Sequence, residues 1–195
     1  MKHLVRTFVG IRVGRVVRRR LHALGTELKS GDPALKLPAI EDIHLTLQYL
    51  GNTPQEDIAP LGEAMAEAAE GFGPIEVLYR GLGAFPNAER PRVLWAGIEE
   101  PDGENRIGAL AKAVGRSLRS VGYRPEKRAF HAHVTVARVH RRPPERVFEA
   151  LGRSAANAEE MDFGTETLSE LKLILSDPGN HPYHYIDLTT VDLEG

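Results

Sequence analysis

Two copies of a His-x-Thr motif, each inside an apolar, strand-like stretch, constrain the fold of this chain most. The first copy is His44-Leu45-Thr46 within residues 43–51, and the second is His133-Val134-Thr135 within residues 131–138. Side chains alternate between the two faces of a strand, so the His and the Thr of each motif share a face while the residue between them points into a core. Each stretch therefore presents an imidazole beside a hydroxyl on a rigid support.

The elements around the motifs predict an α+β fold with an internal repeat. Apolar periodicity predicts strands over 4–13, 75–82, 92–98, 130–139, 167–175 and 183–191, and helices over 17–28, 54–70, 107–118 and 145–151. Positions 44 and 133 are 89 residues apart in a chain of 195. We expect one domain, residues 1–195, made of two intertwined lobes with one motif each. In this bilobal, pseudo-symmetric fold, two antiparallel-rich sheets would face a central cleft, with helices on the outside.

Three local signals place element boundaries. Thr53 followed by Pro54 and Glu56 reads as a capping box that starts a helix at Pro54. Gly152 is expected to end the helix that begins near Glu145. The Pro- and Gly-containing segment 176–182 lies between the last two strands and predicts a hairpin.

Composition excludes several classes of protein. The chain has no Cys, which excludes disulfides, thiolate catalysis and Cys-based zinc sites. A net charge of −2 gives no global field of the kind found in nucleic-acid coat or membrane-surface proteins. No apolar run is long enough to span a bilayer, and residues 1–6 lack the apolar centre of a signal peptide. We therefore expect a cytoplasmic protein with no membrane partner, and nothing demands more than a monomer.

Two imidazoles with hydroxyls between them suit phosphodiester cleavage. A histidine has an unperturbed pKa of about 6.5, so one can accept a proton while the other donates one near neutral pH. A base would activate water, an acid would protonate the departing alkoxide, and Thr46 and Thr135 would donate to the phosphate oxygens. A strained cyclic phosphate is the phosphodiester most easily opened in this way.

The chain resembles the 2H phosphoesterase superfamily, which is named for two His-x-Thr motifs. Within it, the resemblance is to the RNA 2′,3′-cyclic phosphodiesterase branch, historically called 2′-5′ RNA ligases. It covers nearly the whole chain. The residues that carry it are Phe8, the motif at 44–47 with Leu50-Gly51, segments 83–86 and 91–97, Phe130, the segment 133–138, and the late Ser176, Gly179 and Tyr185.

This resemblance implies a bilobal α+β fold and hydrolysis of an RNA terminal 2′,3′-cyclic phosphate to a 2′-phosphomonoester, with no metal or other cofactor. By the same resemblance His44 would be the proton donor and His133 the proton acceptor. The roles exchange in the reverse reaction, 2′-5′ ligation. Thr46 and Thr135 would bind the phosphate.

Four further residues are candidates, and three of them have a structural alternative. Arg138 either reaches the phosphate or is an outward charge at the strand end. Phe85 and Tyr185 either wall a nucleotide pocket, where they can stack on a base, or pack in the core. The family usually has a basic residue and Pro before the second His. Here His131 and Ala132 stand there, and His131 shares a face with His133, so it can reach the same pocket.

Three alternatives stay open. His131, His133 and His140 could instead ligate a metal, although no carboxylate or Cys lies among them. A nucleotide-binding module without catalysis would keep the same pocket. A phosphodiesterase of a small cyclic-phosphate metabolite would need no basic approach to the cleft, whereas an RNA enzyme would. The candidates for that approach are Arg90, Arg92, Lys127, Arg128, Arg138, Arg141 and Arg142.

Overall fold

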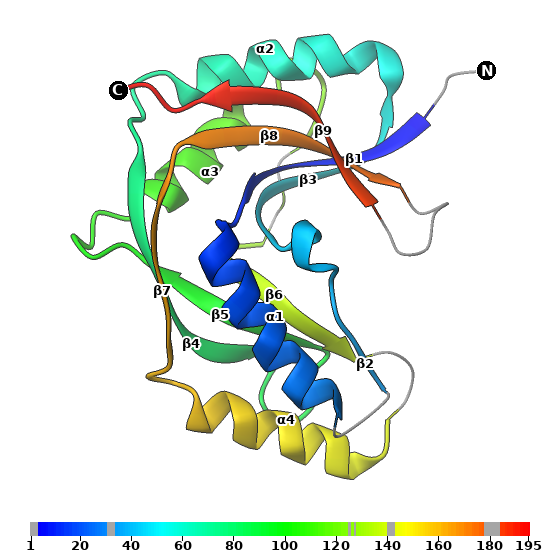
Figure 1. Cartoon of the computed structure of the whole chain (residues 1–195). Helices are drawn as coiled ribbons and strands as arrows, with labels where there is room; N and C mark the ends of the chain where they lie inside the picture. Colours follow the sequence, from blue (N-terminus) through cyan, green and yellow to red (C-terminus); the bar gives the residue numbers. More distant parts are fainter. Residues whose placement is uncertain (1–3, 31–33, 125, 127, 140–142, 178–183) are drawn as a thin grey trace.

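One strongly curled antiparallel sheet forms the frame of the molecule (Figure 1). The computed structural model describes residues 4–30, 34–124, 126, 128–139, 143–177 and 184–195. Its strands are β1 (Leu4–Arg12), β2 (Leu35–Lys36), β3 (His44–Pro54), β4 (Ile75–Phe85), β5 (Val93–Glu99), β6 (His133–Val139), β7 (Asp162–Leu168), β8 (Glu170–Asp177) and β9 (His184–Asp192). Its helices are α1 (Arg15–Ser30), α2 (Ile58–Ala69), α3 (Arg106–Ser117) and α4 (Glu145–Asn157), with short 3₁₀ turns η1 (Ile40–Asp42) and η2 (Gln55–Asp57).

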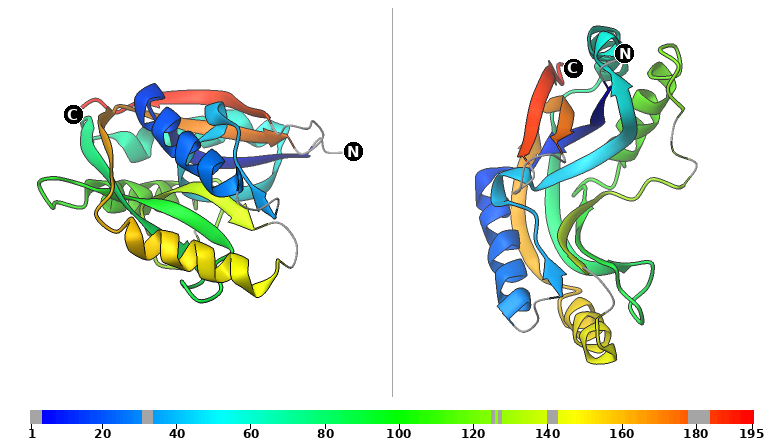
Figure 2. Two further views of the ribbon diagram at one scale, coloured as in Figure 1. Left: turned by 60° about the horizontal axis from the view of Figure 1, so that its bottom comes forward. Right: turned by 90° about the vertical axis from the view of Figure 1, so that its right-hand side faces the viewer.

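The expectation of two separate sheets is wrong. The strands form one sheet in the order β7-β4-β5-β6-β3-β1-β8-β9, with β2 added beside β6. The two motif strands, β3 and β6, are direct neighbours at the middle of this sheet and pair antiparallel, with Leu45 opposite Val134. The predicted alternation of side chains is confirmed. Leu45 and Val134 are fully buried, while the His and Thr residues beside them are half-buried. The motifs therefore share one face of the sheet, whose curl is visible in Figure 2.

The helices link the two halves of the sheet. Helix α1 connects β1 to β2 but packs on β6 and β7, in the other half. Helix α3 connects β5 to β6 but packs on α2 and β3. Helix α2 also covers β8 and β9, and α4 packs on β4. Most of the buried apolar side chains form one continuous core. That the two halves are repeated lobes stays a prediction.

Strand β7 is the longest element that the sequence pattern missed. The predicted strand 167–175 is two strands, β7 and β8, which meet at Ser169. Strand β7 is mostly polar and buries only Phe163 and Leu168, so it lacks regular alternation. Its Glu166 accepts hydrogen bonds from the amide of Gly14, at 2.6 Å, and from the hydroxyl of buried Tyr79. A carboxylate is favourable at the N-terminus of α1, and it fastens this helix to the far half of the sheet.

Two predicted helix boundaries are also wrong, for packing reasons. Thr53 and Pro54 pair with Val5 and Leu4 of β1, so the strand continues through the expected capping box and α2 begins only at Ile58. Helix α4 passes through Gly152 to Asn157. A Cβ at Gly152 would lie 2.5 Å from the carbonyl oxygen of Ala88, so this glycine permits close packing instead of ending the helix.

The predicted hairpin is confirmed in its pairing, since β8 and β9 are antiparallel neighbours, while its connection lies outside the described residues. In the described part of the chain, no helix has the length and apolar character needed to cross a membrane.

Candidate active site

The register of β3 and β6 brings the two motifs together. Because Leu45 lies opposite Val134 in an antiparallel pair, His44 falls opposite Thr135 and Thr46 falls opposite His133. These four side chains point to the same face, and we call them the His–Thr quartet. Each histidine therefore has the threonine of the other motif as its cross-strand neighbour.

Each histidine of the quartet is held by the same backbone contact. Nδ1 of His44 is 2.6 Å from the carbonyl oxygen of Asp42, and Nδ1 of His133 is 2.7 Å from that of His131. A carbonyl oxygen can only accept, so Nδ1 carries the hydrogen and donates in both rings. Nε2 is then the nitrogen that can exchange a proton with a substrate.

His44 lies in an aromatic environment that disfavours its charged form. Its ring centroid is 4.6 Å from that of Phe8 and 5.1 Å from that of Tyr185. Burial, followed by the positive charges of Arg12 and Arg138 and the neighbouring His133, lowers the pKa of His44 from 6.5 to about 4, although the bond to the Asp42 carbonyl opposes the shift. His44 is therefore neutral at pH 7 in the free protein.

His133 has a corresponding set of ring neighbours on the other half of the sheet. Its centroid is 5.0 Å from Phe85, 6.0 Å from Trp95 and 6.1 Å from His131. Burial lowers the pKa of His133, and the charges of His131 and Arg138 act in the same direction. A base that is neutral near pH 7 can accept a proton from water.

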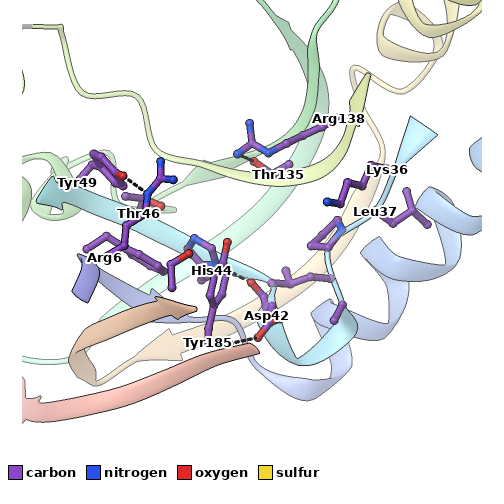
Figure 3. Close-up of a pocket in the computed structure, with 15 residues that line it drawn as sticks. Arg6, Lys36, Leu37, Asp42, His44, Thr46, Tyr49, Thr135, Arg138 and Tyr185 are labelled. Atoms are coloured by element: carbon purple, nitrogen blue, oxygen red, sulfur yellow. Dashed lines mark hydrogen bonds between the residues drawn. The ribbon is translucent and has the colours of Figure 1, made fainter. Parts of the chain in front are cut away.

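A cavity of about 570 Å³ opens beside His44 (Figure 3). Its wall includes Thr46 and Thr135 of the quartet, the rings of Phe8 and Tyr185, and an apolar segment, Leu37-Pro38-Ala39. Three cations also line it: Arg6, Lys36 and Arg138. Arg6 lies with Tyr49 at one end, Lys36 lies at the other, and His44 is between them. The size is typical of a small-ligand site, and the charges favour an anion.

Comparisons with known proteins agree with this geometry. The family model described as "LigT like Phosphoesterase" matches residues 13–95 and 98–172. The chain belongs to the LigT-like phosphoesterase family. This confirms the resemblance to 2H phosphoesterases inferred from the motifs.

Two curated relatives of this LigT-like chain are each named RNA 2′,3′-cyclic phosphodiesterase. The protein of Archaeoglobus fulgidus is 37% identical over 141 residues, which is 72% of this chain and 76% of the relative. That of Aeropyrum pernix is 35% identical over 161 residues, 83% of this chain and 85% of the relative.

Solved structures share the fold of this LigT-like chain over almost its full length. A Thermus thermophilus protein superposes with a TM-score of 0.74 at 25% identity, covering 97% of this chain and 98% of that protein. E. coli LigT complexed with 3′-AMP has a TM-score of 0.73 at 20% identity, covering 99% and 100%, and this likeness bears on the fold alone.

The predicted site residues of the LigT-like chain divide between two places. His44, Thr46, Thr135, Arg138 and Tyr185 line the cavity. Arg138 reaches back to Thr135, with Nη2 at 3.4 Å from the hydroxyl oxygen, so it is not simply an outward charge.

Phe85 and His131, expected in the same pocket as Tyr185, lie instead around His133. Phe85 is 5.2 Å and His131 4.5 Å from the ring of Trp95, measured between centroids. They are absent from the wall of the cavity beside His44.

Most of the cations expected along the cleft do not line this cavity. Arg92 lies over the ring of Phe148, at 5.7 Å from its centroid. Arg90 and Arg128 are exposed elsewhere. The others, Lys127, Arg141 and Arg142, fall outside the described residues.

The alternative metal site gains no support from the described residues, among which no three His, Cys, Asp or Glu side chains are grouped as metal ligands would be. His140 lies outside them.

Arg12 is a site residue that the sequence did not reveal. It pairs with His44 in the ladder between β1 and β3. Its guanidinium donates to the carbonyl oxygens of Glu41 and Tyr185, each at 3.0 Å, and to the carboxylate of Asp187 at 2.7 Å. Arg12 thus holds the η1 turn, whose Asp42 carbonyl orients His44, against the strand that carries Tyr185.

The electrostatics of this LigT-like site predict an acid-shifted titration of His44. In the free protein we expect an imidazole pKa near 4, measured by NMR titration with the signal assigned by its loss in His44→Gln. Bound 2′-AMP should raise this pKa, because the phosphate charge offsets that of Arg138. Since the acid must be charged and both histidine pKa values are lowered, kcat/KM should rise as the pH falls from neutral. A value at or above 6.5 in the free protein would contradict this account.

Proposed function

We propose that this LigT-like phosphoesterase is an RNA 2′,3′-cyclic phosphodiesterase that works by two-histidine acid–base catalysis. The observation that carries the proposal is the His–Thr quartet, because the pairing of Leu45 with Val134 places both His-x-Thr motifs side by side on the sheet. The names of relatives at 37% and 35% identity support the substrate.

The reaction needs one proton taken and one given. Nε2 of His133 removes a proton from water as the water oxygen attacks phosphorus. The bond between phosphorus and the 3′ oxygen breaks, and His44 protonates that oxygen. The products are a 2′-phosphomonoester and a free 3′ hydroxyl, and exchange with solvent restores both histidines. No metal takes part in this scheme. The same steps with a 5′ hydroxyl in place of water would form a 2′-5′ linkage, and their reverse would cleave it.

The remaining groups of the site would hold the substrate. Thr46 and Thr135 would donate to the non-bridging oxygens, and the charge of Arg138 would favour the phosphate as negative charge develops. Tyr185 beside His44 would contact the nucleoside, and Phe85 with His131 would form a stacking surface beside His133.

The cations of the cavity bear on the two rival functions. A small cyclic-phosphate metabolite needs few charges, whereas Arg6, Lys36 and Arg138 line this cavity together. This favours an RNA end over a small metabolite. A nucleotide-binding module without catalysis has no need for two histidines with a fixed Nδ1–H tautomer, and that arrangement favours an enzyme.

A product assay tests the function directly. The purified protein is incubated, with EDTA present, with a short RNA that ends in a 2′,3′-cyclic phosphate, and phosphorus NMR identifies the product. We expect complete conversion to a 2′-phosphate. A 3′-phosphate product would contradict the assignment of the departing oxygen. Loss of activity in EDTA, restored by metal, would favour the metal alternative.

A further inference from the structure

Beyond the quartet, the cavity carries a second pair of opposed side chains. Lys36 is the register partner of Arg138 where β2 pairs with β6. Both side chains line the cavity. Two cationic side chains therefore line the same end of the cavity, and an anion bound there would be attracted to both.

The order of groups along β6 separates this pair from the reacting phosphate. His133 and Thr135 face Thr46 and His44 across β3, and Arg138, three residues beyond Thr135, faces Lys36 across β2. Arg138 turns back to Thr135, at 3.4 Å, and so contacts the quartet. Lys36 lies further from the quartet along the cavity than Arg138 does.

The apolar wall lies between these two positions. Leu37, Pro38 and Ala39 line the cavity between Lys36 and the η1 turn beside His44. His44 is the group assigned to the departing 3′ oxygen, so the ribose that carries this oxygen would lie against that wall. The 5′ oxygen of the same ribose would then point toward Lys36. In an RNA strand this 5′ oxygen carries the next phosphate.

From this placement we propose that Lys36, opposite Arg138, binds the internucleotide phosphate immediately 5′ of the terminal nucleotide and so forms a subsite for it. The inference rests on the proposed function and extends it. It makes the preferred substrate an RNA strand rather than a cyclic mononucleotide, and makes Lys36 a determinant of that preference.

A pair of matched dinucleotides tests the subsite. Both end in a 2′,3′-cyclic phosphate, but one has an ordinary internucleotide phosphate and the other an uncharged methylphosphonate. The wild-type protein should prefer the charged substrate by about tenfold in kcat/KM, as expected for loss of a hydrogen bond to a charged group. In Lys36→Met this ratio should fall close to one. Lys112→Met, which removes an exposed charge from α3, should keep the tenfold ratio.

Binding measurements keep the subsite testable without turnover. The same two dinucleotides ending in a 2′-phosphate should show the same tenfold ratio in Kd for the wild-type protein, and no ratio for Lys36→Met. In Lys36→Met the affinity should also fall less steeply with rising salt concentration. The change in slope should match the loss of about one phosphate contact. If the protein hydrolyses neither dinucleotide but the Kd ratio is intact, the result counts against the proposed function and not against the subsite. Absence of a ratio in the wild-type protein, or its persistence in Lys36→Met, would overturn the subsite.

Discussion

Replacing either His44 or His133 with alanine is expected to lower kcat by about 10²–10⁴-fold, because each removes one of two proton transfers. Substrate binding should change far less, since the threonines and Arg138 remain. Single-turnover kinetics on an RNA with a 2′,3′-cyclic phosphate end measures the chemical step directly. The double variant should be little worse than the worse single variant, because the two residues act as one unit.

A histidine outside the site provides the control. His22 lies on α1, away from the cavity, and His22→Ala should keep the wild-type rate. Circular dichroism should show that the His44 and His133 variants are folded. A near wild-type rate in either folded variant would falsify the two-histidine mechanism.

Removing the hydroxyl of Thr46 or Thr135 is the second large effect that we expect. Valine keeps the shape and β-branching of threonine but cannot donate to a phosphate oxygen. Loss of one donor to a developing charge costs about 10²–10³-fold in kcat, so Thr46→Val and Thr135→Val should each fall in that range. Thr135→Val should also disturb Arg138, whose Nη2 contacts this hydroxyl.

Serine is the matched replacement, because Thr46→Ser and Thr135→Ser keep the hydroxyl and lose only a methyl group. Both should retain most of the activity. The idea fails if serine and valine variants are equally slow, since packing and not hydrogen bonding would then explain the loss. Phosphate binding by the variants, followed by NMR, gives an independent measure of the missing donor.

Local patterns predicted most of the elements but not how the strands pair. Alternation along 44–47 and 133–136 correctly predicted which side chains are buried. It could not distinguish two motif strands that face each other across a cleft from two that are neighbours in one sheet, because both place the histidines together. The pairing of Leu45 with Val134 is a long-range contact and leaves no periodic signal.

The cavity wall was harder to predict because irregular backbone forms much of it. Tyr49 is three residues after Thr46, so strict alternation would place it on the opposite face. The register shift between β1 and β3 at Val9/Gly10, which lies between Thr46 and Tyr49, changes the parity and brings Tyr49 to the cavity with Arg6. Lys36 belongs to a strand of two residues, which is too short for a pattern.

The cross-pairing of the motifs has a consequence for ancestry. Each histidine faces the threonine of the other motif, so neither half of the chain holds a complete quartet. A primitive half-length protein with one motif could build this site only as a two-fold symmetric dimer, joined edge to edge along its motif strand. Fusing two such copies would keep the site and free the surroundings of the two histidines to diverge, so that Phe8 and Tyr185 now lie beside His44 and Phe85 and Trp95 beside His133.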